Sequence, residues 1–168
     1  MSEVLDEIRI QVGDENLGDS CRRNGCRVFM QDVPSRRVLV DADRAFPAHK
    51  MEGQRCDYVL FFVISGKDTL CAVPMELKSG GVDASEVAGQ LQRGADFAYR
   101  FAPQDLKAVC HPVLFHGGSI HPKQRKTLNR AKVRFRGRQL TIKTARCNQP
   151  RNLVRALGDE VMKVLRVN

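Results

Sequence analysis

Two short apolar segments separated by a turn most constrain what this chain can fold into. The segments 55–64 and 70–78 are rich in Val, Ile and Phe, a composition typical of buried strands. Between them, Ser65–Asp68 consists of residues that favour turns. The sequence therefore predicts a β-hairpin, and pairing Ile64 with Thr69 sets the register of its two strands.

Three charged residues fall on one face of this predicted hairpin. Counting back from the turn places Asp57 opposite Glu76, and residues paired across antiparallel strands have Cβ atoms about 5 Å apart. Lys78 lies two residues beyond Glu76 and shares its face. Two carboxylates this close need a cation or a shared proton between them. We therefore predict a divalent metal site with Lys78 at its edge; the alternative is a structural ion pair between Glu76 and Lys78.

The rest of the chain predicts a single α/β domain over residues 1–168, with a mixed central β-sheet flanked by helices. No internal repeat or linker marks a second domain. Pro74 removes one backbone donor from its strand, which a strand tolerates at an edge or at a bulge. The other predicted elements are helices at 2–12, 83–100, 122–130 and 152–167, a strand at 106–115 and a hairpin at 133–143.

The positive charge of the chain is concentrated in its second half. The net charge is +9, and residues 106–158 contain 13 Lys and Arg with no Asp or Glu. Such a segment favours a polyanionic partner, most simply nucleic acid, over a merely solvated basic surface. Few aromatic residues accompany these cations, so contact with the phosphate backbone is expected rather than base stacking. The predicted contacts are Lys123, Arg125, Lys126, Arg130, Arg134, Arg136 and Lys143, of which Arg134, Arg136 and Lys143 would face outward from the 133–143 hairpin.

The N-terminus and the cysteines bear on the compartment. The first residues are acidic and lack the apolar region of a signal peptide, and no apolar run approaches the ~18 residues of a membrane helix. These features predict a cytoplasmic protein with no membrane partner. In that compartment all six cysteines are expected to be reduced: Cys21, Cys26, Cys56, Cys71, Cys110 and Cys147.

Asp57, the run Glu76-Leu77-Lys78 after a hairpin, and a following helix that carries Gln resemble the PD-(D/E)xK nuclease superfamily. The resemblance covers residues 54–101 and implies a restriction-endonuclease-like fold and a Mg²⁺- or Mn²⁺-dependent nuclease, with DNA as the expected substrate. By this resemblance Asp57 and Glu76 ligate the metal with the Leu77 carbonyl, and Lys78 orients or deprotonates the attacking water.

The resemblance also implies a Gln near the metal and an acid upstream of Asp57. Gln90 and Gln92 are the candidates for the first, with Gln90 preferred, and Glu3 or Glu7 for the second, unless the chain has no such acid. The alternative function is a non-catalytic nucleic-acid-binding or structural subunit on the same fold. The sequence leaves open endonuclease or exonuclease action, DNA or RNA, and whether the chain works alone, as an oligomer or in a larger complex.

Overall fold

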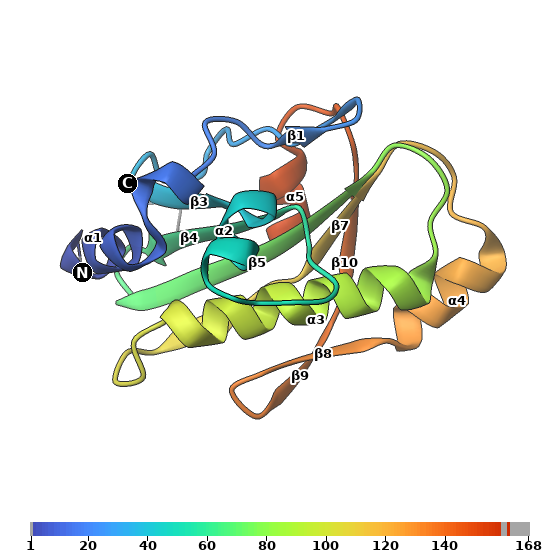
Figure 1. Cartoon of the computed structure of the whole chain (residues 1–168). Helices are drawn as coiled ribbons and strands as arrows, with labels where there is room; N and C mark the ends of the chain where they lie inside the picture. Colours follow the sequence, from blue (N-terminus) through green and yellow to red (C-terminus); the bar gives the residue numbers. More distant parts are fainter. Residues whose placement is uncertain (1, 159–160, 162–168) are drawn as a thin grey trace.

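The computed structural model describes residues 2–158 and 161 and is built around one mixed β-sheet (Figure 1). The strands of this sheet are β3 (Arg37–Asp41), β4 (Tyr58–Ile64), β5 (Thr69–Lys78), β6 (Ala108–Cys110), β7 (Val113–His116) and β10 (Lys143–Arg146). Their order is β10-β7-β5-β4-β3, with β6 also paired to β5. Strands β5, β7 and β10 run parallel to one another, whereas β4 is antiparallel to both β3 and β5.

Helices and two short ribbons complete the fold. The helices are α1 (Ser2–Val12), α2 (Ala42–Ala48), α3 (Ala84–Phe101), α4 (Pro122–Arg130) and α5 (Asn152–Leu157), with a 3-10 helix, η1 (Asp14–Asn16). One ribbon pairs β1 (Arg22–Arg23) with β2 (Cys26–Arg27), and the other pairs β8 (Lys132–Phe135) with β9 (Arg138–Thr141). Figure 1 shows α3 crossing one face of the sheet, with α4 beside its N-terminal end.

The alternation of side chains along β4 divides the core into two layers. Val59 and Phe61 pack in the layer that contains residues of α1 and α3. Leu60 and Phe62 pack in the layer that contains residues of α5 and of the β1–β2 segment. Because successive residues of a strand point to opposite faces, a strand covered on both sides is apolar throughout. This confirms the predicted α/β domain with a mixed central sheet.

The register of the β4–β5 hairpin is as predicted, with Ile64 opposite Thr69 and Tyr58 opposite Met75. Pro74 does not lie in an edge strand, because β5 is a central strand. Pro74 lies where the second neighbour of β5 changes: pairing with β6 ends at Ala72, and pairing with β7 begins at Met75. The missing N–H of the proline therefore falls at a natural break in the pairing.

One other sequence prediction is wrong in part, and another falls partly outside the described residues. The predicted 133–143 hairpin ends at Thr141, and Lys143 instead begins β10, which pairs with β7. The predicted closing helix is present as α5, while most of its second half lies outside the described residues.

The prediction of six reduced cysteines is wrong for two of them. Cys26 and Cys147 form a disulfide across a sequence separation of 121 residues, which joins β2 to the residue after β10. The other four cysteines are free thiols and are buried. Within residues 2–158 and 161, no helix is long and apolar enough to cross a membrane.

Gly94 lets α3 approach the hairpin closely, which gives a first prediction. A Cβ at Gly94 would lie 2.7 Å from both Cys56 Sγ and Pro74 Cβ. We expect Gly94→Ala to lower the free energy of unfolding by about 1–3 kcal/mol, as overpacking of a core does. Gly89→Ala is the matched control on the same helix, because its new methyl meets only the flexible end of the Gln54 side chain. Urea unfolding measures both, and equal stabilities of the two variants would contradict this account.

Candidate active site

Asp57 and Glu76 meet at the open end of the β4–β5 hairpin. The regular strand pairing ends with Tyr58 opposite Met75, and just beyond it the Asp57 side chain is in hydrogen-bonding contact with the Glu76 side chain. The Asp57 N–H donates to the Met75 carbonyl at 3.0 Å, and the Leu77 N–H donates to Asp57 Oδ2 at 2.7 Å. These two hydrogen bonds hold the Asp57 carboxylate beside Glu76, so the structure brings the two predicted acids together.

Glu76 is an acid in an unfavourable place for a negative charge. Its exposed fraction is 3%, and its pKa is raised to about 9 by burial, then by the charge of Asp57 and a side-chain hydrogen bond with it, against the opposing effect of Lys78. Glu76 Oε2 is buried and has no hydrogen-bond donor among the described residues. Two carboxylates offer each other only acceptor atoms, so a proton or a cation must lie between them. Glu76 therefore keeps a proton near neutral pH unless a cation takes its place.

Lys78 and the beginning of α3 form the next part of the site. Lys78 Nζ lies 3.6 Å from Glu76 Oε1 and 3.7 Å from Glu86 Oε1. The side chain of Asp83 caps α3 by accepting a hydrogen bond from the Glu86 N–H, which fixes the first turn of the helix. The ammonium group of Lys78 is thus held between an acid of the sheet and an acid of the helix.

The two candidate glutamines have different surroundings. Gln90 lies one turn after Glu86 and donates to Glu86 Oε1 at 3.5 Å, while its own Oε1 is buried and has no partner among the described residues. Gln92 accepts from the N–H of Arg134 and donates to the carbonyl of the same residue, so it fastens β8 to α3. The structure therefore keeps Gln90 as the candidate near the acids and gives Gln92 a structural role.

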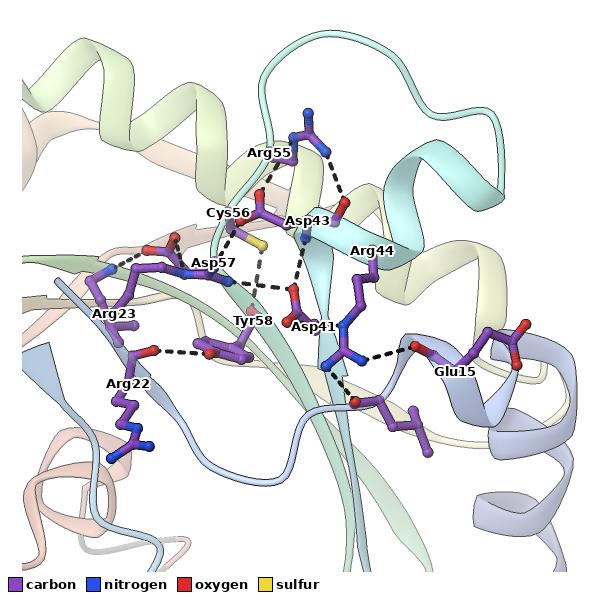
Figure 2. A network of polar contacts seen from close by, with 12 residues as sticks. Glu15, Arg22, Arg23, Asp41, Asp43, Arg44, Arg55, Cys56, Asp57 and Tyr58 are labelled. Carbon is purple, nitrogen blue, oxygen red and sulfur yellow. Dashed lines mark hydrogen bonds and ion pairs between the residues drawn. The ribbon is translucent and has the colours of Figure 1, made fainter.

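Arg23, which the sequence patterns did not indicate, reaches the site from the β1–β2 ribbon. Its Nε lies 3.4 Å from Asp57 Oδ1, and its other nitrogens lie 2.9 Å from Asp43 and 3.4 Å from Asp41 (Figure 2). The guanidinium also lies over the Tyr58 ring, 5.1 Å from its centroid. A metal ion bound at Asp57 Oδ1 would have to displace this resident cation.

The upstream acids suggested by the resemblance are not part of this cluster. Glu3 and Glu7 are exposed on α1. Their neighbour Asp6 pairs with Arg36, which directly precedes β3, whereas Asp57 lies beside the far end of that strand. Since five residues of β-strand span about 13 Å, this expectation is wrong for both glutamates. The acids nearest to Asp57 from an earlier segment are instead those that share Arg23.

The donor set fits a hard divalent cation better than a soft metal. In the described part of the chain there is no group of three or more His, Cys, Asp or Glu side chains placed to hold a metal. Mg²⁺, however, is bound through one or two carboxylates together with waters and substrate phosphates. The unpartnered Glu76 Oε2 is the atom that such an ion would satisfy. Leu77 contributes its N–H to Asp57, and a metal contact from its carbonyl stays a prediction.

The predicted nucleic-acid contacts divide into groups. Four of them, Lys123, Arg125, Lys126 and Arg130, lie on α4, whose Gln124 accepts the Ala84 N–H at the start of α3 near the site. Arg134 is exposed and belongs to β8, where its N–H donates to Gln92, farther along α3.

The last two predicted contacts, Arg136 and Lys143, do not lie near the acids. Arg136 donates to the carbonyls of Pro103 and Leu106, beyond the opposite end of α3. Lys143 is half-buried and donates to the carbonyl of Leu157, so the expectation that it faces outward on the ribbon is wrong.

Comparisons with models of protein families, with curated proteins and with solved structures find no match. The candidate function therefore rests on the side chains of this chain.

The raised pKa of Glu76 predicts an unusual pH dependence of stability. The folded state holds a proton on Glu76 up to pH about 9, while the unfolded chain releases it near the ordinary value of 4.5. The folded state thus binds more protons in this window, and the free energy of unfolding falls as the pH rises through it. We expect Glu76→Gln to remove this decline and to stabilise the protein at pH 7 by on the order of 3 kcal/mol.

Chemical unfolding of both proteins between pH 5 and 9, without divalent metal, tests this expectation. Glu86→Gln is the matched control, because Glu86 also pairs with Lys78 but is half-exposed. Parallel pH profiles for wild type and Glu76→Gln would mean that Glu76 ionises normally.

Proposed function

We propose that this chain is a Mg²⁺- or Mn²⁺-dependent nuclease of restriction-endonuclease-like fold that hydrolyses phosphodiester bonds, with DNA as substrate. The observation that carries the proposal is the buried Glu76 carboxyl, which contacts the Asp57 carboxyl, lacks a donor at Oε2 and has Lys78 Nζ 3.6 Å from Oε1. A buried acid with a strongly raised pKa beside a second acid is typical of functional sites. DNA is preferred because the superfamily that the chain resembles mostly cuts DNA.

Each residue of the site has a part in this chemistry. Asp57 and Glu76 would hold the divalent ion, which when bound supplies charge neutralisation on the phosphate and lowers the pKa of a coordinated water. Lys78, placed between Glu76 and Glu86, would orient or deprotonate the attacking water, or stabilise the charge that develops on the phosphate. The free Oε1 of Gln90 would accept a hydrogen bond from a water at the same site.

A nucleic-acid-binding module without catalysis is the second candidate. It is favoured by Arg23, which already neutralises Asp57, and by the absence of a third metal-ligating side chain among residues 2–158 and 161. In that case the Glu76–Lys78 contact would be structural, and no metal ion would replace Arg23 at Asp57 or the proton on Glu76.

A cleavage assay separates the two candidates. Purified protein is incubated with end-labelled DNA and Mg²⁺ or Mn²⁺, and the products are resolved by size. We expect cleavage by the wild type and a loss of at least about 100-fold in rate for Glu76→Gln and Lys78→Ala, the order expected when a metal ligand or a proton-transfer group is removed. Binding of DNA should persist in both variants.

Lys67→Ala is the matched control, because Lys67 is an exposed lysine in the turn at the opposite end of the same hairpin. It should cut DNA at the wild-type rate. DNA binding with no cleavage under either metal would overturn the nuclease proposal and support the binding module.

A further inference from the structure

Three residues outside the acid pair line up at the carboxyl ends of the parallel strands. The register pairs Lys78 of β5 with His116 of β7, and His116 with Arg146 of β10. Adjacent strands lie about 4.8 Å apart, so Lys78 and Arg146 are about 10 Å apart along this edge. Side chains of paired residues point to the same face, which here is the face of Glu76 and α3. The row of Lys78, His116 and Arg146 therefore extends the candidate active site across the carboxyl ends of β5, β7 and β10.

Two glycine-containing loops lie directly beyond this row. The Gly117 N–H donates to the Lys78 carbonyl at 2.9 Å, and a Cβ at Gly117 would lie 2.9 Å from the Ser79 carbonyl oxygen. The loop after β7 is thus packed against the loop after β5. A Cβ at Gly80, Gly81 or Gly118 would meet nothing within 4 Å, so the outer side of both loops is open.

The side chains of the row hold these loops in place. His116 Nδ1 lies 2.8 Å from the Gly118 carbonyl, and this contact requires the proton on Nδ1. Arg146 donates to the Gly117 carbonyl at 3.2 Å. Open backbone at the carboxyl ends of parallel strands is where ligands of α/β proteins generally bind.

Two arginines give this edge positive charge. Arg146 is exposed, and Arg125 reaches from α4 to Thr144 Oγ1 at 3.1 Å, two residues before Arg146 on the same face of β10. Neither arginine takes part in an ion pair among the described residues, whereas Lys78 and Arg23 both contact carboxylates. The two arginines therefore offer charge that an anionic ligand can neutralise.

We propose that Arg146 and Arg125 bind a backbone phosphate near the one held at Asp57 and Glu76, so that a nucleic-acid strand crosses the carboxyl ends of β5, β7 and β10. The proposal rests on the proposed function for the reacting phosphate and adds the path of the strand. It replaces the β8–β9 ribbon as the main contact, because Arg136 of that ribbon is bonded to carbonyls beyond the opposite end of α3.

Fluorescence anisotropy with a labelled DNA duplex tests the path. Binding is measured in the Glu76→Gln background, so that cleavage is not required, at several salt concentrations. We expect Arg146→Ala and Arg125→Ala each to reduce the slope of log affinity against log salt by about 0.9, because each removes one phosphate contact. Arg146→Lys should retain the slope. Arg138→Ala, an exposed arginine of the ribbon, is the matched control and should leave it unchanged.

The outcomes distinguish this proposal from the proposed function. Loss of slope for Arg146→Ala and Arg125→Ala in a protein that never cuts DNA would support the path and defeat the nuclease. Cleavage that depends on Glu76, with unchanged slopes for both arginine variants, would overturn the path alone. A larger loss of slope for Arg138→Ala than for the other two variants would mean that the β8–β9 ribbon makes the main phosphate contact and would overturn the proposed path. Thermal melting of each variant excludes loss of folding as the cause.

Discussion

The pairing of β4 with β5 sets two carboxylates against each other inside an apolar sheet, and the surrounding structure accommodates that contact. Burial and the neighbouring acid raise the pKa of Glu76, so the pair needs a positive partner or a proton. Lys78 approaches Glu76 from the same strand, and Arg23 approaches Asp57 from a separate ribbon. Gly94 allows α3 to lie close over the hairpin, against Cys56 and Pro74.

Such a contact costs stability, and proteins that need only a stable sheet avoid it. A neutral residue at position 76 would satisfy the apolar surroundings without a proton or a cation. An acid at position 76 has a use if the proton on Glu76 is replaced by a cation during function. A divalent cation is the natural competitor, because it binds the same oxygens and is favoured by the same pair of charges. Under the proposed function, Arg23 would be a third competitor for Asp57 beside the proton and the metal ion.

The sequence was sufficient for features that depend on neighbouring segments. The register of the hairpin followed from two apolar runs and one turn, and it agrees with the observed pairing from Tyr58–Met75 to Ile64–Thr69. Asp57 and Glu76 are in contact just beyond the last of these pairs. Features that depend on distant pairing were missed. Cys26 meets Cys147 only after β10 has joined β7, and Arg23 reaches Asp57 only because the β1–β2 ribbon lies over Tyr58. Lys143 was assigned to the preceding ribbon because strand pattern alone does not say which partner a strand takes.

The mixed character of the sheet explains why the charges gather at one edge. Strand β4 begins where β5 ends, so Asp57 and Glu76 share the carboxyl end of β5. The next strand, β7, is parallel to β5, which requires a crossover connection, and α3 supplies it. The crossover begins beside Lys78, so the N-terminus of α3, with its positive partial charge, lies at the same edge. Had β7 been antiparallel, a short hairpin would have sufficed, and neither α3 nor the loop after β7 would adjoin the acids. The parallel pairing of β7 thus adds the helix terminus and the open glycine loops to the acids and the lysine that the hairpin already holds together.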